Sequence, residues 1–404
     1  MEQIKELKPN TGPLKGLKVL DLTRVLSGPY ASMWLASMGA DVIKIENPKD
    51  PDVSRAYYPV IDGHSAYYAT MNRNKRGVTL NLKSEEGKKL FLELAKDADA
   101  VIENFRPGVM DKLGVGYEEL KKVNPGIVYA SISGYGTYGP YAKKPGYDVV
   151  AQAMSGLMST TGFPEGPPTR VGCSVGDTVG GITSLVALLA ALYCKQQTGL
   201  GQKVEVALVD SLVTLSTPDY VRYFVEGLAP VRMGNYYRSW APYGTYQAKD
   251  GYYNIGCGTD EFFFKLARAI GHPEMVDDPR FQTHPARIEN IEAMDAVINE
   301  WAMQRSVKEV CAIIDEAGVP CAPVYTIRDL EKDEHIAGAR EMFPTIHQPG
   351  IGEFRVTNLP VRFAASGLAP IQAAPELGAN NEEIFGALGY TPEKLAQLRA
   401  QGAI

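Results

Sequence analysis

One aspartate of the sequence stands where a carboxylate can act as a nucleophile. Asp177 lies in the stretch Gly176-Asp-Thr-Val-Gly-Gly181, directly before the most apolar helical pattern of the chain. An aspartate at a helix start often serves only as an N-cap. The flanking glycines, however, let a ligand or another backbone approach closely, and the helix dipole is expected to keep the carboxylate ionised. Since an ionised carboxylate can attack an acyl group, two interpretations of Asp177 stay open, cap and nucleophile.

Basic side chains gather around two predicted strand ends, where they could hold phosphates through charge-assisted hydrogen bonds or form a solvated rim. The first group is Arg73, Lys75, Arg76 and Lys83, and the second is Arg106 and Lys112. In Asn104-Phe-Arg-Pro-Gly108 an amide, an aromatic ring and a guanidinium stand together. An adenine ring with phosphates would use all three.

Other patterns carry less chemistry. Gly134-Tyr-Gly-Thr-Tyr-Gly139 matches the dinucleotide motif G-x-G-x-x-G, but that motif requires a helix to open at the last glycine. Pro140 and Lys143-Lys-Pro145 follow here and predict a loop. The five histidines lack metal-ligand spacing. The five cysteines are odd in number and lack C-x-x-C pairs, which predicts reduced thiols and a cytoplasmic protein.

The elements that must position these residues alternate between strand and helix through the first 210 residues. Strands are predicted at 18–22, 41–45, 78–82, 100–103, 127–131 and 203–208, with helices at 30–38, 85–96 and 178–195. This alternation predicts an α/β fold with a mainly parallel sheet covered on both faces. Ligands of such folds bind beyond the carboxyl ends of the strands. The loops after Leu22, Ile45 and Glu103 are therefore the expected site.

From about Pro218 the texture of the sequence changes. A stretch rich in Tyr, Trp, Pro and Gly precedes helical patterns at 260–270, 288–303 and 306–317, and the chain closes with helices at 381–388 and 391–401. The predicted domains are a large α/β domain at 1–217, a small domain with its linker at 218–330, and a linker with a return to the large domain at 331–404.

Charge and hydropathy exclude several classes of protein. The 404 residues include 41 Lys and Arg against 47 Asp and Glu, a formal net charge of −6, which argues against a nucleic-acid partner. The most apolar stretch, 179–194, falls short of the ~20 residues that span a bilayer, so no membrane partner is expected. The charged start of the chain lacks the apolar core of a signal peptide.

Taken together, the motifs resemble the class III coenzyme A transferases, the family of formyl-CoA transferase, carnitine CoA-transferase and bile-acid CoA transferases. The resemblance runs from about Pro13 to Ile404. It is carried by Leu17-Lys-Val-Leu-Asp-Leu-Thr-Arg-Val-Leu-Ser-Gly-Pro29, Gly39-Ala-Asp-Val-Ile-Lys-Ile-Glu46, Asn72-Arg-Asn-Lys-Arg76, Glu103-Asn-Phe-Arg-Pro-Gly108, Gly176-Asp177 and Thr198-Gly-Leu-Gly-Gln202.

The resemblance implies a Rossmann-like large domain built from both chain ends, a smaller inserted α+β domain, and an interlocked homodimer with the active site near its interface. It implies coenzyme A and acyl-CoA as substrates, no permanently bound cofactor and no metal. Asp177 matches the family's nucleophile. The positions that bind CoA or border the reacting carbonyl are Leu26, Ser27, Asn47, Leu80, Lys83, Asn104, Phe105, Arg106, Lys112, Tyr147 and Asp148. At Asn47 some members carry an arginine.

The implied mechanism moves CoA from an acyl-CoA donor to a carboxylic acid. Asp177 would form a mixed anhydride and then an aspartyl-CoA thioester, with water kept out. N–H groups near Gly180-Gly181, or those of the 236–242 segment, would stabilise the oxyanion. A catalytically inactive CoA-binding protein is a rival that an intact Asp177 disfavours.

Two departures from relatives bear on the substrate. Formyl-CoA transferases have a glycine run where this chain has Tyr236-Tyr-Arg-Ser-Trp-Ala-Pro242, which disfavours oxalate and formate. Tyr147, Tyr237 and Trp240 are expected to border the acid pocket, unless the aromatic residues only pack the domain linker. Aromatic walls would suit a medium-sized acid, including a carnitine-like one, through cation–π attraction. Acyl-CoA racemases, the alternative function, have a histidine where Tyr147 stands, and tyrosine is too weak a base for that reaction near neutral pH.

Overall fold

The computed structural model describes residue 8 and residues 10–404, which form two compact units. The large unit contains the described residues up to Leu157 together with Arg170–Val221 and Glu341–Ile404. The small unit contains Arg222–Arg340 and also Met158–Thr169. Met158–Thr169 joins the small unit because the N–H of Gly234 donates to the Gly162 carbonyl at 2.9 Å. The sequence offered no sign of this pairing, so the predicted boundaries at 217 and 330 differ from those of the units.

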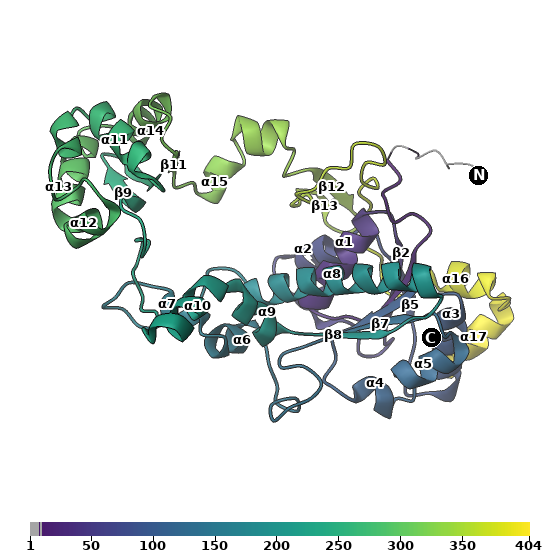
Figure 1. The fold of residues 1–404 in the computed structure, drawn as a ribbon. Coiled ribbons are helices and arrows are strands. Elements are labelled where there is room, and N and C mark those ends of the chain that lie inside the picture. Colours follow the sequence, from purple (N-terminus) through teal and green to yellow (C-terminus); the bar gives the residue numbers. More distant parts are fainter. Residues whose placement is uncertain (1–7, 9) are drawn as a thin grey trace, which may run out of the picture. The chain divides into compact units, whose positions relative to one another are not determined.

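A six-stranded parallel sheet forms the centre of the large unit, in the order β5-β2-β1-β6-β7-β8 (Figure 1). Its strands are β1 (Lys18–Asp21), β2 (Asp41–Glu46), β5 (Arg76–Thr79), β6 (Ala100–Glu103), β7 (Val128–Ser133) and β8 (Lys203–Ala207). The predicted α/β fold with a parallel central sheet is confirmed. Strand order reverses at β1, whose two neighbours are β2 and β6, and such a switch point opens a crevice at the carboxyl ends of the strands.

Helices cover both faces of the sheet, each over its own apolar core (Figure 1). One face carries α1 (Ser27–Ser37), α6 (Asp148–Met154), α8 (Val175–Thr198) and α9 (Leu208–Leu215). The other carries α3 (Glu85–Lys96), α4 (Val109–Lys112), α5 (Tyr117–Val123), α16 (Asn381–Ala387) and α17 (Pro392–Ala400). The remaining elements of this unit are α2 (Ala66–Asn72), the hairpins β3 (Val60–Ile61) with β4 (His64–Ser65) and β12 (Thr345–Gln348) with β13 (Gly352–Arg355), and a 3₁₀ turn at Val53–Ala56.

Helix α8 is the longest helix that the structure describes. It has 24 residues, more than predicted, and by length and composition it is apolar enough to cross a membrane. Its inner face, which includes Leu185 and Leu188, is buried in the core that α1 and the sheet share. Its outer face leaves Val186 61% and Tyr193 67% exposed. The prediction that this stretch is too short to span a bilayer is therefore wrong, because α8 is long enough. Its buried inner face nevertheless belongs to a protein core.

The C-terminal segment returns to the large unit and covers the edge strand β5. The side chain of Asn380 accepts the N–H of Gly77 at 2.8 Å, and that of Asn381 accepts the N–H of Thr79 at 2.9 Å. These side chains satisfy donors of β5 that no neighbouring strand reaches, which protects the edge from pairing with another chain.

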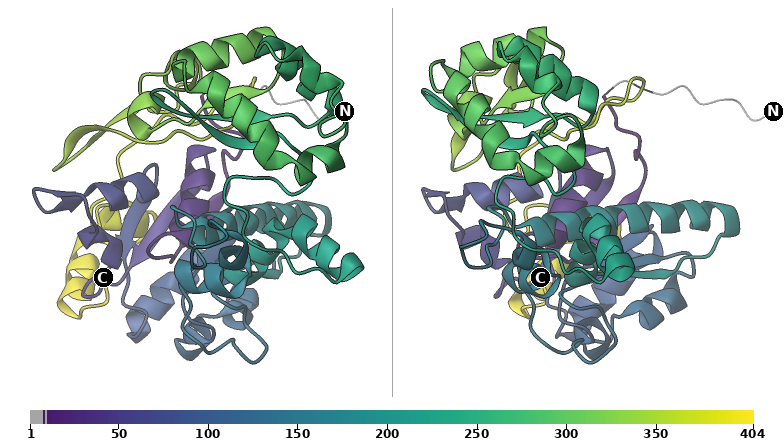
Figure 2. Two further views of the ribbon diagram at one scale, coloured as in Figure 1. Left: turned by 90° about the vertical axis from the view of Figure 1, so that its left-hand side faces the viewer. Right: turned by 60° about the vertical axis from the view of Figure 1, so that its left-hand side comes forward.

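The small unit is an α+β unit with its own core. Its antiparallel sheet has the order β11-β10-β9, and its helices appear green in both views of Figure 2. The elements are β9 (Tyr243–Ala248), β10 (Gly251–Gly256), α11 (Asp260–Ala269), α12 (His284–Glu289), α13 (Ile291–Ala302), α14 (Val307–Glu316), β11 (Cys321–Pro323) and α15 (Ile327–Leu330), with a 3₁₀ turn at Pro273–Val276 and a π turn at Glu334–Ala339. Helices α7 (Leu157–Thr160) and α10 (Thr217–Glu226) lie where the chain passes between the units.

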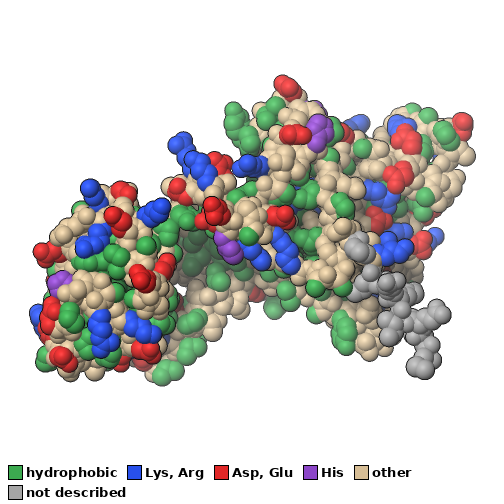
Figure 3. All heavy atoms as spheres, turned by 90° about the horizontal axis from the view of Figure 1, so that it is seen from above, with side chains coloured by type: hydrophobic (Ala, Val, Ile, Leu, Met, Phe, Trp, Pro, Cys, Tyr) green, Lys and Arg blue, Asp and Glu red, His purple; other side chains and the backbone are tan. Residues whose placement is uncertain are grey.

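Charges of both signs are interspersed on the face that Figure 3 shows, in keeping with the balanced composition.

Candidate active site

A cavity of the large unit lies at the predicted place, beyond the carboxyl ends of the strands. It has a volume of about 460 Å³ and is lined by residues that follow β1, β2, β5 and β6. Four predicted CoA-binding residues meet there: Asn47, Leu80, Lys83 and Phe105. Apolar walls such as Leu113 stand beside the ammonium groups of Lys49 and Lys83. A planar apolar group that carries phosphates matches this combination.

A second cavity of about 150 Å³ shares Phe105 with the first. It brings together Arg106, Lys144 and Tyr147, of which the sequence analysis had selected Arg106 and Tyr147. Tyr147 is 72% exposed in a single chain. The loop with the G-x-G-x-x-G pattern is explained here, because a Cβ on Gly134 would come within 2.9 Å of the Gly146 backbone. No helix opens at Gly139, as predicted.

Asn47, which lines the first cavity, and Asn104, which lines the second, also have structural contacts, whereas Lys112 lies elsewhere. Asn104 accepts the N–H of Arg24 at 2.7 Å and donates to the Arg24 carbonyl at 2.8 Å, so its amide holds the loop that contains Leu26 and Ser27. Asn47 accepts the N–H groups of Lys49 and Asp50 and thereby shapes its own loop. Lys112 is exposed on α4 and lines neither of the two cavities.

Asp177 is the third residue of α8 and does not cap it, so the cap interpretation is wrong. The helix begins after Ser174, whose side chain makes no capping bond. The capping oxygen comes from Asp148, which accepts the N–H of Gly176 at 2.7 Å and that of Asp177 at 3.4 Å. Asp148 is 9% exposed. Asp148 was expected among the CoA-binding residues, and in the structure its carboxylate binds the N–H groups at the start of the helix that carries Asp177.

Burial, and then the charge of Asp148, raise the pKa of Asp177 to about 7. The helix dipole was expected to keep this carboxylate ionised, but burial and a like charge outweigh a dipole that contributes only about 0.3–1 kcal/mol. Among the residues that the structure describes, no hydrogen bond or ion pair reaches the Asp177 carboxylate. Burial and the nearby Asp177 also raise the pKa of Tyr67 to about 12, which keeps that phenol protonated.

The glycines after Asp177 serve helix packing and not ligand access, contrary to expectation. A Cβ on Gly180 would lie 2.4 Å from the Leu208 side chain, and one on Gly181 would lie 2.6 Å from the Ser27 carbonyl oxygen. Asp177 and Gly181 are four residues apart and share a helix face. Asp177 therefore lies one turn from the contact between α8 and the start of α1, and the N–H groups of both glycines belong to the interior of the helix.

The aromatic segment 236–243 is anchored inside the small unit. The Tyr236 hydroxyl donates to Asp295 at 2.7 Å, and the rings of Trp240 and His284 lie edge to face with centroids 3.8 Å apart. Tyr237, 50% exposed, packs on Tyr243 with centroids 5.2 Å apart. These contacts are those of an ordered loop that still offers an exposed ring.

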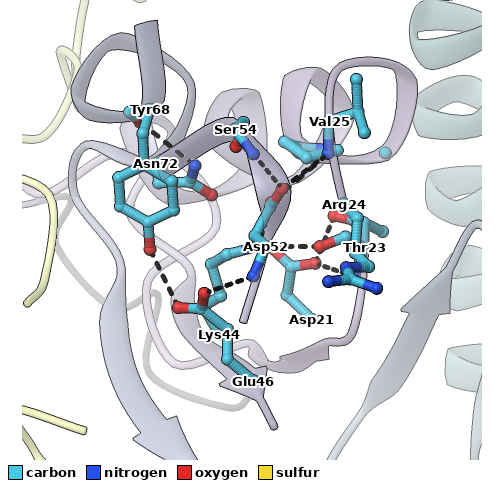
Figure 4. A network of polar contacts seen from close by, with 12 residues as sticks. Asp21, Thr23, Arg24, Val25, Lys44, Glu46, Asp52, Ser54, Tyr68 and Asn72 are labelled. Atoms are coloured by element: carbon cyan, nitrogen blue, oxygen red, sulfur yellow. Dashed lines mark hydrogen bonds and ion pairs between the residues drawn. The ribbon is translucent and has the colours of Figure 1, made fainter. Parts of the chain in front are cut away.

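Sequence reasoning missed a buried charge network under the first cavity (Figure 4). Lys44 pairs with Asp52 at 3.1 Å and Lys75 with Asp21 at 2.9 Å, and all four side chains are fully buried. One signal was available, because Lys44 interrupts a strand that was predicted to be buried on both faces. Among the described residues, no group of His, Cys, Asp and Glu side chains could hold a metal ion.

Comparisons with known proteins identify the family of the chain. The family model for CoA-transferase family III matches residues 14–381. The chain is 36% identical to succinyl-CoA–D-citramalate CoA-transferase of Chloroflexus aurantiacus, over 97% of this chain and 98% of the relative. It is 41% identical to acetyl-CoA:oxalate CoA-transferase of Acetobacter aceti, over 81% of this chain and 85% of the relative.

A solved structure shares the fold. A CAIB/BAIF family protein from Brucella suis superimposes with a TM-score of 0.83 at 37% identity, covering 94% of this chain and 100% of that one. The family match spans both units, and the curated relatives are named as CoA-transferases. The chain therefore belongs to CoA-transferase family III and is an enzyme of the CoA-transferase class.

Proposed function

We propose that Asp177 carries CoA from an acyl-CoA donor to a carboxylic acid acceptor. The observation that carries this proposal is the Asp177 carboxylate at the start of α8, which has no hydrogen-bonding partner among the described residues and is held by Asp148 through the Gly176 N–H. A desolvated carboxylate with a pKa near 7 is a stronger nucleophile than an ordinary aspartate and is half ionised at neutral pH.

The reaction proceeds in four acyl transfers. The Asp177 carboxylate attacks the donor thioester, which forms a mixed anhydride and releases the CoA thiolate. The thiolate attacks the Asp177 carbonyl, which forms the aspartyl-CoA thioester and releases the donor acid. The acceptor carboxylate attacks that thioester, which forms a second anhydride and again releases the CoA thiolate. The returning thiolate then takes the acceptor acyl group and regenerates the carboxylate.

The oxyanion donors are proposed to come from the start of α1 and not from Gly180 and Gly181. Gly180 and Gly181 lie within α8, so their N–H groups are used by the helix. The start of α1 is adjacent through Ser27 and Gly181, and α1 has no side-chain cap. The first N–H groups of α1 are donors of the kind that stabilise a tetrahedral oxyanion. The 236–242 segment remains the other proposed source.

The first cavity is proposed to hold the nucleotide end of CoA as a substrate. Leu80 and Phe105 would contact the base, while Lys83 would meet the phosphates. The second cavity, with Arg106 and Tyr147, would follow along the CoA arm.

The acceptor class is proposed from the relatives and the aromatic segment together. Names of relatives include citramalate, oxalate, mesaconate and glutarate, with succinyl-CoA as the donor in several. Short dicarboxylic acids are therefore the first acceptors to test. The presence of an oxalate enzyme among the relatives weakens the case against oxalate, and a carnitine-like acid remains in the panel. The racemase alternative is not favoured, because the relatives named for citramalate, oxalate and mesaconate are all CoA-transferases.

A homodimer is proposed from the exposed apolar face of α8. Ile182, Val186 and Tyr193 stand 41%, 61% and 67% exposed on this helix, and a second copy of the chain would cover them.

The test of the mechanism uses isotopic oxygen. An acceptor acid labelled with ¹⁸O in its carboxylate is incubated with a donor acyl-CoA and the enzyme, and peptides are analysed by mass spectrometry. The mechanism transfers one ¹⁸O to the Asp177 side chain and, after the next turnover, to the released donor acid. Product formation without label in the Asp177 peptide would refute the anhydride route while leaving CoA transfer intact.

A further inference from the structure

Val25 has a backbone conformation that its side chain disfavours. Its φ is +69°, in the left-handed region that β-branched residues avoid. Such conformations persist only where the surroundings impose them, and they concentrate at functional sites. Val25 lies in the loop that leads from the carboxyl end of β1 into α1.

The Asp52 carboxylate binds the backbone N–H of Val25 (Figure 4). The Val25 N–H donates to the two carboxylate oxygens of Asp52 at 3.1 and 3.3 Å. Asp52 is itself held by the Ser54 N–H at 3.0 Å and by Lys44 Nζ at 3.1 Å. Lys44 also donates to the Thr23 carbonyl at 2.7 Å. The Asp52 carboxylate and the Lys44 ammonium group therefore bind the loop at two points.

The Asp52–Lys44 pair is buried and lies between the first cavity and the helix contact near Asp177. Asp52 is 2% exposed and Lys44 is fully buried, yet Asp52 also belongs to the wall of the first cavity. Two residues after Val25, the Ser27 carbonyl touches α8 at Gly181, one turn from Asp177. A change in the backbone conformation of Val25 would therefore move the start of α1 relative to both Asp177 and the cavity.

We propose that Asp52 is a positioning residue of the transfer reaction, which holds Val25 left-handed and thereby sets the start of α1 against the helix that carries Asp177. This proposal rests on the proposed role of Asp177. A loop that needed only to turn would use glycine, which takes positive φ without strain. Because valine disfavours the positive φ, the conformation of the loop depends on the hydrogen bonds from the Val25 N–H to buried Asp52.

The test combines Asp52→Ala, which removes the carboxylate that binds the Val25 N–H, with Val25→Gly, which removes the steric strain of the positive φ. Asp52→Ala should lower kcat by about tenfold to a hundredfold, since a displacement of about 1 Å near reacting groups costs that much. Val25→Gly alone should stay within about twofold of wild type, and in the double variant it should restore most of the lost kcat because glycine accepts the native φ. If Asp52→Ala lost activity only through misfolding, the fraction of active enzyme would fall. Adding Val25→Gly would not restore that activity.

Two further variants keep the test decisive if Asp52→Ala folds poorly. Asp52→Asn retains an oxygen that accepts the Val25 N–H, so it should keep more kcat than the alanine variant. Asp99→Ala is the matched control: Asp99 likewise binds a backbone N–H, that of Lys18 at 3.0 Å, and a lysine, Lys195 at 2.8 Å, but at the amino end of β1. It should lose stability and keep kcat.

Two results would overturn the proposal: wild-type kcat in folded Asp52→Ala, or a double variant no better than Asp52→Ala while the Asp99→Ala control behaves as expected. Trapping with hydroxylamine separates this failure from that of the proposed function. If wild-type enzyme yields no hydroxamate on the Asp177 peptide, the role of Asp177 fails; if it does and the Asp52 variants are unaffected, only the positioning role fails.

Discussion

Asp148 caps the helix that carries Asp177 and also raises the pKa of the Asp177 carboxyl group. The Asp148 oxygen accepts the Gly176 N–H at 2.7 Å, and its charge adds to burial in bringing the Asp177 pKa to about 7. One side chain thus holds the start of the helix that carries Asp177 and raises the proton affinity of the Asp177 carboxylate. The two effects can be separated by mutation, because only the second requires a charge.

Replacing Asp177 with Asn should reduce CoA transfer by about a thousandfold or more, because an amide cannot form the anhydride. Binding of CoA, measured by calorimetry, should change little, since the first cavity lies at other residues. Retention of more than a few per cent of wild-type turnover would exclude Asp177 as the nucleophile.

The pH profile of kcat/KM should rise to a plateau with a midpoint near 7, since that ratio reports the free enzyme and the carboxylate must be ionised to attack. Asp148→Asn keeps an oxygen for the Gly176 N–H but removes the negative charge. Its midpoint should therefore move to lower pH, while the melting temperature changes little. A midpoint that stays in place would show that burial alone sets the pKa.

Stability should depend on pH through the same group, with the opposite sign to a salt-bridged aspartate. The folded pKa of Asp177 is raised from 3.8 to about 7, so ionisation favours the unfolded chain and stability falls as pH rises from about 4 to 7. The full shift corresponds to at most about 4 kcal/mol. Asp177→Asn should therefore be more stable than wild type at pH 8, and its advantage should shrink towards pH 4, as measured by denaturant titration. Equal stabilities at pH 8 would contradict a buried, ionised carboxylate.

Trp240→Gly should change the ranking of acceptor acids more than the apparent KM for acyl-CoA, if the aromatic segment walls the acid pocket. Tyr252→Ala, which removes a ring that is 56% exposed on β10 of the same unit, is the control and should leave the ranking unchanged. An equal loss for every acid, with a lower melting temperature, would show that Trp240 only packs on His284.

Val186→Glu should disrupt the proposed dimer, because it places a charge on the exposed apolar face of α8. Light scattering coupled to gel filtration should show wild-type protein at twice the chain mass of 44.0 kDa and a smaller or aggregated variant. Wild-type protein at the mass of one chain would refute the homodimer.

The local elements follow from the sequence because their causes lie within a few residues. Helix α3 was predicted at its observed bounds, Glu85–Lys96, where Ser84 caps the first turn and apolar residues recur at helical spacing. Strand β6 was predicted at its observed bounds too. The carboxyl ends of parallel strands share one edge of a sheet, so the position of the first cavity, with Leu80 and Phe105, was also foreseeable.

The chemistry of the site depended on contacts between distant segments. Asp148 reaches α8 across 28 positions and Asp52 reaches Val25 across 27, and no local pattern announces either bond. Burial of Asp177 arises only when α8 packs on its neighbours, so the dipole at its own helix start gave the wrong expectation for its pKa. Sequence alone therefore indicated most of the elements and the family resemblance, and it singled out Asp177 as a candidate. Tertiary structure decided that Asp148 holds the helix start at Asp177, that the pKa of Asp177 is raised, and that Gly180 and Gly181 serve packing. These properties depend on desolvation and long-range hydrogen bonds, which exist only in the folded chain.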